Sequence, residues 1–337
     1  MTRPVIRASG KHRLNAARNE NDMAADNRLL ILSRSAAVYA DLIKDLRLPD
    51  LEITACKTAG EASAHLDRCT IILGEPSRIA RVVEGARVLK WVQSTYAGVE
   101  ELLGPGARSD YILTGVKGVF GPFMSEYVIG YLLALERHFF TAYRNQHDRT
   151  WRRLPYQSLR GRLIGICGLG SIGRHLARTA EHFGLRIWGY KRTAETVPEA
   201  ERVFTGPGFD EFLSQPDYIV NTLPSTPATA RLFDETAFRT MKTTAVLINI
   251  GRGDAVVEEA LIRALQQGLI GGAVLDVFEQ EPLPEDSPLW TLPNVVITPH
   301  NSGFSFPADI VGLFAANYRR FSKGEPLLYR VDFERGY

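Results

Sequence analysis

The sequence predicts an α/β protein with two domains, each built on a parallel sheet. Short apolar runs alternate with helical patterns along nearly the whole chain, which is typical of parallel strands joined by helices. The chain has 337 residues, enough for two domains of ~150 residues each. A glycine-rich turn after the apolar run at 163–167 separates a first series of strands from a second.

The first series extends to about residue 120 and contains no glycine-rich turn. Its strands are expected at 29–32, 51–55, 70–73 and 89–92, and its helices at 37–46, 59–66 and 79–83. In the first of these helices, Val38, Leu42 and Leu46 lie four residues apart. This spacing is typical of a helix.

A long apolar helix is predicted at 124–140, with no proline inside it. Glu126, Glu136 and Arg137 interrupt its apolar residues. They argue against a membrane span, because a span needs ~20 mostly apolar residues. We therefore expect a helix buried between domains or between subunits. The polar stretch 144–160 leads from this helix to the glycine-rich turn.

The second series has the strand and helix content of a complete doubly wound nucleotide-binding domain. Its strands are expected at 163–167, 186–190, 218–222, 245–250, 273–275 and 295–298. Its helices are expected at 209–213, 236–241 and 257–267, besides one that begins at the glycine-rich turn. A final amphipathic helix is predicted at 310–321.

The glycine-rich turn has the spacing Gly-x-Gly-x-x-Gly, formed by Gly168, Gly170 and Gly173. Between a strand and a helix, the first glycine permits the sharp turn and the second lets the backbone approach a pyrophosphate. The third lets the helix pack closely on the strand. Backbone N–H groups at the helix start, around Ser171 and Ile172, then face the phosphates. A plain connection is the alternative, but the strand before and the helix after favour dinucleotide binding.

The end of the next strand indicates which dinucleotide binds. In this fold an acidic residue about 20 positions beyond the glycines commonly binds the ribose 2′-OH of NAD. The sequence has Lys191, Arg192 and Thr193 there instead. Two cations pair with a 2′-phosphate that an acid would repel. We predict NADPH/NADP+ as the cofactor, with NADH less favoured; the alternative is an ordinary solvated strand end.

Three further polar stretches follow predicted strands, where ligands bind in open α/β sheets. They contain Arg252 between two glycines, Glu281 and His300. An arginine can anchor a carboxylate, a histidine can donate a proton near neutral pH, and a carboxylate can keep that histidine protonated. Taken singly, each has a plain explanation as a turn residue, a solvated acid or a packed histidine. Their joint placement after successive strands predicts a site for a 2-oxo acid.

These stretches resemble the D-2-hydroxyacid dehydrogenase family over nearly all of residues 28–337. The resemblance is carried by 165–173, 249–254, 276–284 and 298–303, with further support from 93–99 and 317–324. It implies two Rossmann-like or flavodoxin-like α/β domains with parallel sheets, the substrate domain being discontinuous. That domain would comprise 28–122 and 306–337, and the dinucleotide-binding domain 123–305.

The resemblance also implies a role for each candidate residue. Arg252 would bind the substrate carboxylate and carbonyl, His300 would be the acid and base, and Glu281 its partner. The backbone of Tyr96-Ala97-Gly98 would hold the substrate carboxylate, and the helix from Met124 would join a homodimer interface. The residues expected at the cofactor are Gly168, Gly170, Ser171, Ile172, Gly173, Lys191, Arg192, Thr193, Leu223, Pro224, Ile250, Gly251 and Asp276, the last beside the nicotinamide.

Within that family, a basic second-strand end is similar to the NADPH-dependent glyoxylate/hydroxypyruvate reductases. The expected activity is therefore the reduction of a small 2-oxo acid to the D-2-hydroxy acid. The alternatives are an NAD-dependent dehydrogenase of a bulkier 2-hydroxy acid, and a nucleotide-sensing, corepressor-like binding protein on the same fold. Formate oxidation is disfavoured, because the formate enzymes have Gln where this chain has Glu281. The loop 119–124 is explained equally by a substrate pocket and by a core at the domain hinge.

Composition narrows the class further. The formal net charge of +2 gives no reason to expect a nucleic-acid or membrane partner. The three cysteines have no metal-ligand spacing, so no metal is expected, and they fit a reducing cytoplasm. Residues 1–19 are basic and contain no acid. For the segment 1–27 we favour a tail without fixed structure, or a start codon assigned too early because Met23 lies just before the first strand, over a transit peptide, for which serines are too few.

Overall fold

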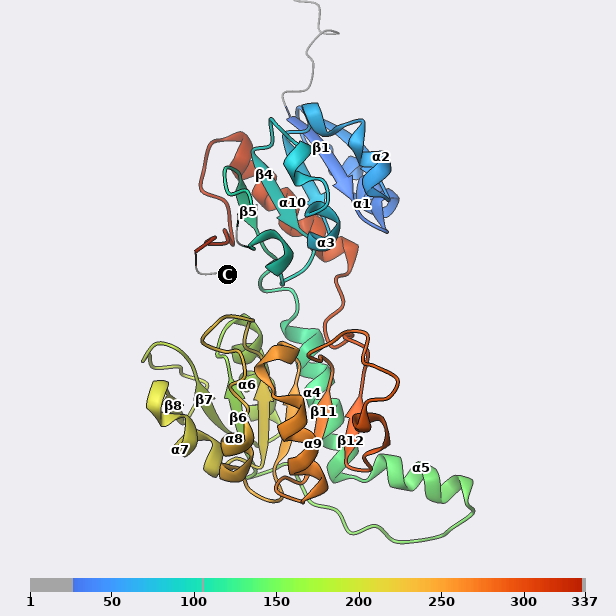
Figure 1. Ribbon diagram of the computed structural model, residues 1–337, viewed down its shortest axis with the longest axis vertical. Coiled ribbons are helices and arrows are strands. Elements are labelled where there is room, and N and C mark those ends of the chain that lie inside the picture. The colour runs from blue at the N-terminus through green and yellow to red at the C-terminus, as the bar shows by residue number, and fades with distance from the viewer. Residues whose placement is uncertain (1–26, 105, 335–337) are drawn as a thin grey trace, which may run out of the picture.

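Two parallel sheets organise the protein, as the computed structural model shows (Figure 1). The structure describes residues 27–104 and 106–334. The predicted α/β class with two parallel-sheet domains is confirmed. The tail predicted at 1–27 lies outside the described residues, apart from Asn27, which already belongs to the first strand.

The first sheet contains five strands: β1 (Asn27–Leu32), β2 (Leu51–Cys56), β3 (Ile71–Gly74), β4 (Trp91–Ser94) and β5 (Ile112–Thr114). Their order is β2-β1-β3-β4-β5, and each neighbouring pair is parallel. The sequence does not predict β5, because an apolar run of only three residues resembles many loops. The predicted helix at 37–46 is α1 (Ala36–Asp45).

The other helices of this domain are shorter than predicted. The helix expected at 59–66 is α2 (Ala59–Ser63), followed by a 3₁₀ helix, Leu66–Arg68. The helix expected at 79–83 is α3 (Pro76–Ile79), which starts earlier because proline suits the first helical position. Two more 3₁₀ helices follow, Val83–Gly85 and Glu100–Leu102.

The second sheet contains seven strands: β6 (Leu163–Cys167), β7 (Arg186–Tyr190), β8 (Arg202–Phe204), β9 (Tyr218–Asn221), β10 (Val246–Asn249), β11 (Gly272–Leu275) and β12 (Val295–Ile297). Their order is β12-β11-β10-β9-β6-β7-β8, all parallel. Only β8, again three residues long, is missed by the sequence analysis. The chain moves outward in opposite directions from β6, which creates the crevice where ligands bind in such sheets.

Helices cover this second sheet on both sides, as Figure 1 shows. They are α6 (Ser171–His182), α7 (Phe209–Ser214), α8 (Glu235–Thr240) and α9 (Glu258–Gln266), with 3₁₀ helices at Gly206–Gly208, Gly253–Ala255 and Pro288–Thr291. The helices predicted at 209–213, 236–241 and 257–267 therefore agree with the structure to within a residue at each end.

The long helix predicted at 124–140 is in fact two helices. α4 (Gly121–Glu136) and α5 (Phe139–His147) are separated at His138, whose φ of 55° lies in the left-handed region and ends the first helix. α4 packs against α6. α5 buries none of its residues and projects from the domain in Figure 1.

The last helix, α10 (Pro307–Ser322), returns to the first sheet (Figure 1). Its Phe314 stacks on Trp91 of β4 with ring centroids 5.2 Å apart. Its Asn317 donates a hydrogen bond to the buried Gln93 at 3.1 Å. Because this C-terminal helix completes the core of the N-terminal sheet, we propose the boundaries 28–122 with 306–337 for one domain and 123–305 for the other.

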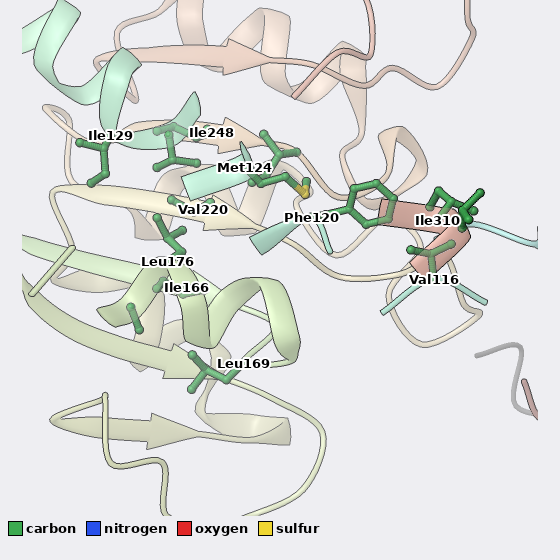
Figure 2. Close-up of a cluster of buried hydrophobic side chains, with 14 of the residues drawn as sticks. Val116, Phe120, Met124, Ile129, Ile166, Leu169, Leu176, Val220, Ile248 and Ile310 are labelled. Carbon is green, nitrogen blue, oxygen red and sulfur yellow. The ribbon is translucent and has the colours of Figure 1, made fainter. Parts of the chain in front are cut away.

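The loop 119–124 contributes to a core at the domain junction. Phe120 and Met124 are buried, and Figure 2 shows them between Ile310 of α10 and Ile248 of the second sheet. A Cβ added to Gly303 would lie 3.2 Å from Met124. The two segments that connect the domains, around Met124 and around Gly303, therefore pack tightly against each other. Of the two explanations for this loop, the packing favours the hinge core.

Candidate active site

The glycine-rich turn has the geometry that a dinucleotide requires. Gly168 has φ +99°, a conformation that residues with a side chain rarely adopt. A Cβ on Gly173 would lie 2.0 Å from the carbonyl oxygen of Gly168, so only glycine permits this contact between helix and strand. A Cβ on Gly170 would meet nothing within 4 Å. The open space at Gly170 lies at the start of α6, next to Ser171 and Ile172, and fits a pyrophosphate.

Predicted cofactor residues from two neighbouring strands lie beside this turn. Leu223 and Pro224 follow β9, and Ile250 and Gly251 follow β10, which is paired with β9. A Cβ on Gly251 would lie 2.7 Å from the carbonyl oxygen of Leu223. The structure therefore brings these four residues together at the carboxyl end of the sheet.

The side chain of Asn221 fixes this arrangement. Its Nδ2 donates to Oδ1 of Asn249 at 2.9 Å, and its Oδ1 accepts from the N–H of Leu223 at 3.1 Å. Both asparagines are buried at the ends of β9 and β10. These amide contacts hold the two loops that flank the crevice in a fixed relation.

The residues predicted to bind a 2′-phosphate lie directly after β7. Lys191, Arg192 and Thr193 follow Tyr190, the last residue of that strand. The ammonium group of Lys191 is 2.8 Å from Oε2 of Glu195. The sequence analysis did not consider Glu195, which is four residues beyond Lys191 and five beyond the strand end.

Glu281 and His300 form a direct hydrogen bond. Nδ1 of His300 lies 2.7 Å from Oε2 of Glu281. This hydrogen bond raises the pKa of His300 above its ordinary value of 6.5, although burial acts in the opposite direction. Burial raises the pKa of Glu281, but hydrogen bonds from His300 and from the N–H of Phe278 outweigh it, so the pKa lies below its ordinary value. The pair therefore favours a histidinium beside a carboxylate.

Asp276 lies beneath the loop that carries His300. The residue is fully buried, and its carboxylate accepts hydrogen bonds from Thr298 Oγ1 at 2.5 Å and from the N–H groups of Asn301 and Ser302, each at 2.9 Å. Its backbone carbonyl accepts from the N–H of His300 at 2.9 Å. Asp276 is expected beside a nicotinamide; the contacts that the structure gives its carboxylate are with the His300 loop.

A tyrosine of α4 extends this hydrogen-bond chain. The Oη of Tyr127 is 2.6 Å from Oγ1 of Thr298. A carboxylate only accepts hydrogen bonds, so Thr298 donates to Asp276 and Tyr127 must donate to Thr298. Burial raises the pKa of Tyr127, so it keeps the proton it donates. His300 itself has φ +52°, a left-handed conformation that needs such support in a non-glycine residue.

Arg252 reaches from the second domain to the first. Its Nε donates to Oε1 of Glu100 at 2.9 Å, and its Nη1 donates to the carbonyl oxygen of Gly251 at 2.8 Å. A Cβ on Gly98 would lie 2.1 Å from Nη2 of Arg252. The guanidinium therefore rests on the loop predicted to hold the substrate carboxylate. Its charge also lies close enough to His300 and Glu281 to act on the pKa of each.

The loop Tyr96-Ala97-Gly98 is only partly available to a ligand. The hydroxyl oxygen of Ser94 accepts from the N–H of Tyr96 at 2.9 Å, and the hydroxyl donates back to the Tyr96 carbonyl at 2.8 Å. The N–H groups of Ala97 and Gly98 have no acceptor among the described residues. They are thus two backbone donors of this loop that have no partner among the described residues, and Gly98 lies beside Arg252.

Several contributing residues escape the sequence analysis. Glu100 follows the segment 93–99 directly and Thr298 opens the segment 298–303, so both lie at the edge of recognised motifs. Tyr127 has no sequence signal, because an aromatic residue in an apolar helix is explained equally well by packing.

The fold and the site together define a dinucleotide-dependent oxidoreductase with a histidine–carboxylate pair and an arginine whose charge acts on both members of the pair. A family model for the NAD-binding domain of D-isomer specific 2-hydroxyacid dehydrogenases matches residues 129–302. A family protein from Aeromonas salmonicida is 45% identical, with a TM-score of 0.88 over 91% of this chain and 99% of that one. The chain therefore belongs to the D-isomer specific 2-hydroxyacid dehydrogenase family, whose members are NAD(P)-dependent oxidoreductases.

Two more distant structures are informative about cofactors. An NADPH-dependent glyoxylate/hydroxypyruvate reductase from Sinorhizobium meliloti, crystallised with NADP and sulfate, is 27% identical, with a TM-score of 0.84 over 92% of this chain and all of that one. A D-isomer specific 2-hydroxyacid dehydrogenase from Xanthobacter autotrophicus, in complex with NADPH and MES, is 28% identical, with a TM-score of 0.81 over 92% and 99% of the two chains. Among the described residues of the present chain, none of the helices is both long and apolar enough to cross a membrane.

Proposed function

We propose that the protein reduces a small 2-oxo acid of the glyoxylate or hydroxypyruvate type to the D-2-hydroxy acid, with NADPH as the hydride donor. The observation that carries this proposal is the hydrogen bond between His300 and Glu281, with Arg252 close enough for its charge to act on both side chains. It supplies a protonated acid beside an anion-binding group, which is the combination that carbonyl reduction of an acid requires.

We infer that one nitrogen of His300, Nε2, is the proton donor. Nδ1 donates its hydrogen bond to Glu281, so Nδ1 keeps its proton. Nε2 is then the nitrogen that can give a proton to the substrate. Protonated Nε2 donates to the carbonyl oxygen of the substrate, and the histidine becomes neutral. Arg252 binds the substrate carboxylate and stabilises negative charge on the carbonyl oxygen, an effect of about 2.7–4 kcal/mol for one well-placed donor in other enzymes.

The turn at 168–173 and the ends of β9 and β10 are proposed to hold the cofactor, which supplies the hydride when bound. Lys191 and Arg192 favour NADPH, because both can pair with a 2′-phosphate. The relatives from Sinorhizobium and Xanthobacter, crystallised with NADP and NADPH, support that choice. Glu195 competes for Lys191, but it lies on the exposed side of the loop and can move away.

We further propose a homodimer formed through α5 and the segment after it. Large aromatic side chains of this region are exposed, namely Phe139, Phe140, Tyr143, Trp151 and Tyr156. Monomeric proteins rarely leave a large apolar patch in contact with water, so a second copy of the chain is the proposed cover. The mass measured by light scattering at micromolar concentration tests this.

A cytoplasmic location is proposed because Cys56, Cys69 and Cys167 are buried and unpaired.

The decisive experiment measures NADPH consumption with glyoxylate, hydroxypyruvate, pyruvate and bulkier 2-oxo acids, and repeats the panel with NADH. The proposal expects turnover to be fastest with glyoxylate and hydroxypyruvate, and faster with NADPH than with NADH. His300→Ala should reduce turnover by about 10²–10⁴-fold, the usual contribution of a general acid, while NADPH still binds. NADPH binding without turnover on any acid would instead support the nucleotide-sensing alternative.

A further inference from the structure

The ion pair between Glu100 and Arg252 joins the two domains at the site. Glu100 begins the 3₁₀ helix that follows β4 in the first domain, and Arg252 follows β10 in the second. Their atoms Oε1 and Nε are 2.9 Å apart. The side chain of Arg252 is 28% exposed and that of Glu100 is 41% exposed, so the pair is open to solvent and to small ligands.

Glu100 lies where an anionic ligand of Arg252 is expected. A Cβ on Gly98 would be 2.6 Å from Oε2 of Glu100 and 2.1 Å from Nη2 of Arg252. Both charged groups therefore lie close to the backbone of Gly98, on the side where a side chain would project. That backbone belongs to the loop whose N–H groups at Ala97 and Gly98 have no acceptor among the described residues. A side-chain carboxylate is thus already bound to the arginine next to Gly98 of this loop.

We propose that Glu100 is an internal carboxylate gate, which occupies Arg252 until the carboxylate of a 2-oxo acid takes its place. This inference rests on the proposed function, in which Arg252 anchors the substrate. Two carboxylates at one guanidinium repel each other at short range. Glu100 is tethered to the site and so competes at a high effective concentration. Substrate binding is then an exchange of one carboxylate for another, and Glu100 weakens the affinity for every anionic substrate.

The test compares Glu100→Gln and Glu100→Ala with the matched control Glu101→Gln in the full chain. Glu101 is the next residue, is exposed, and makes no contact with Arg252 among those the structure gives. Two quantities are measured: KM for glyoxylate with saturating NADPH, and the Kd of oxalate for the NADPH complex by calorimetry. Oxalate is the probe because it presents a carboxylate to Arg252 and does not react.

The gate predicts that the KM for glyoxylate and the Kd of oxalate both fall by about two- to fivefold in the two Glu100 variants. This is the change in affinity that corresponds to the loss of a partly exposed ion pair. Glu101→Gln should keep the wild-type values. A rise in KM with a fall in kcat/KM in the Glu100 variants would show that Glu100 positions Arg252, and would overturn the gate. Unchanged values in both variants would overturn it as well. Thermal melting checks that each variant is folded. Because the side chain of Glu100 is partly exposed, its replacement should leave the fold intact.

The proposed function and the gate fail in distinguishable ways. If the wild-type protein turns over 2-oxo acids but the Glu100 variants show no gain, only the gate is wrong. If no variant consumes NADPH with any acid, the proposed function is wrong. The oxalate measurement then still decides whether Glu100 competes with an anion for Arg252, because it requires no turnover.

Discussion

Nδ1 of His300 lies 2.7 Å from Oε2 of Glu281, and this contact sets the protonation state of the site. The hydrogen bond raises the pKa of His300 above its ordinary value of 6.5, so the ring stays protonated further toward neutral pH. Reduction requires the protonated ring, so kcat/KM for the 2-oxo acid should fall as the pH rises through this raised pKa. Oxidation of the hydroxy acid requires the neutral ring and should rise over the same range.

Replacing Glu281 by Gln removes the charge that holds the histidine proton. The pKa of His300 should then fall, and the descending limb of the pH profile for reduction should move to lower pH. The measurement is kcat/KM against pH for the wild type and Glu281→Gln, with the exposed Glu285→Gln as control. A profile that Glu281→Gln leaves in place would mean that a group other than His300 titrates in that limb.

The sequence predicts most of this site because of one property of parallel sheets. The carboxyl ends of all strands meet at one edge, so the residues after β6, β9, β10, β11 and β12 are expected to come together without any knowledge of packing. The same property explains why Gly251 and Leu223 are neighbours. What it does not give is the direction in which a side chain points: Asp276 follows β11, yet its carboxylate turns under the His300 loop.

Contacts between distant segments are the part that the sequence does not reveal. Glu100 pairs with Arg252 across 152 positions of chain, and Tyr127 reaches Thr298 across 171. Each depends on how the two domains or α4 and the second sheet pack, and no local pattern encodes that. The break at His138 escapes for a related reason, because an apolar pattern with helical spacing continues on both sides of a single left-handed residue.

Cofactor choice should depend on the residues after β7. The double variant Lys191→Ala/Arg192→Ala should raise the KM for NADPH by about 10²–10⁴-fold, because charge-assisted hydrogen bonds contribute roughly 1.5–3 kcal/mol each. The KM for NADH should stay near its wild-type value. Glu195→Gln is the matched opposite: it releases Lys191 from a competing carboxylate, so NADPH should bind more tightly. An equal loss with NADH and NADPH would remove the proposed 2′-phosphate site.

The chain from Tyr127 through Thr298 to Asp276 should hold His300 in its left-handed conformation. Thr298→Val removes a donor to a buried carboxylate and should cost about 1.5–3 kcal/mol of stability, with a lower kcat. Tyr127→Phe leaves the Thr298–Asp276 bond intact and should have a smaller effect on both. Thermal melting and the separate values of kcat and KM check this order. A larger effect for Tyr127→Phe than for Thr298→Val would show that the tyrosine acts by another route.

An added methyl group should lower the stability of the protein at Gly173 but the affinity for NADPH at Gly170. In Gly173→Ala the new Cβ would lie 2.0 Å from the Gly168 carbonyl oxygen. The helix must then move off the strand, at a cost of about 1–3 kcal/mol or more, and the melting temperature should fall.

In Gly170→Ala the new Cβ meets no protein atom within 4 Å. Stability should change by at most about 1 kcal/mol, the difference between glycine and alanine at a helix N-cap. The methyl group would, however, occupy the space through which a pyrophosphate approaches the backbone, so NADPH should bind more weakly. Melting curves and NADPH titrations of both variants separate the two effects. If Gly170→Ala binds NADPH as well as the wild type does, the phosphates do not lie over this turn.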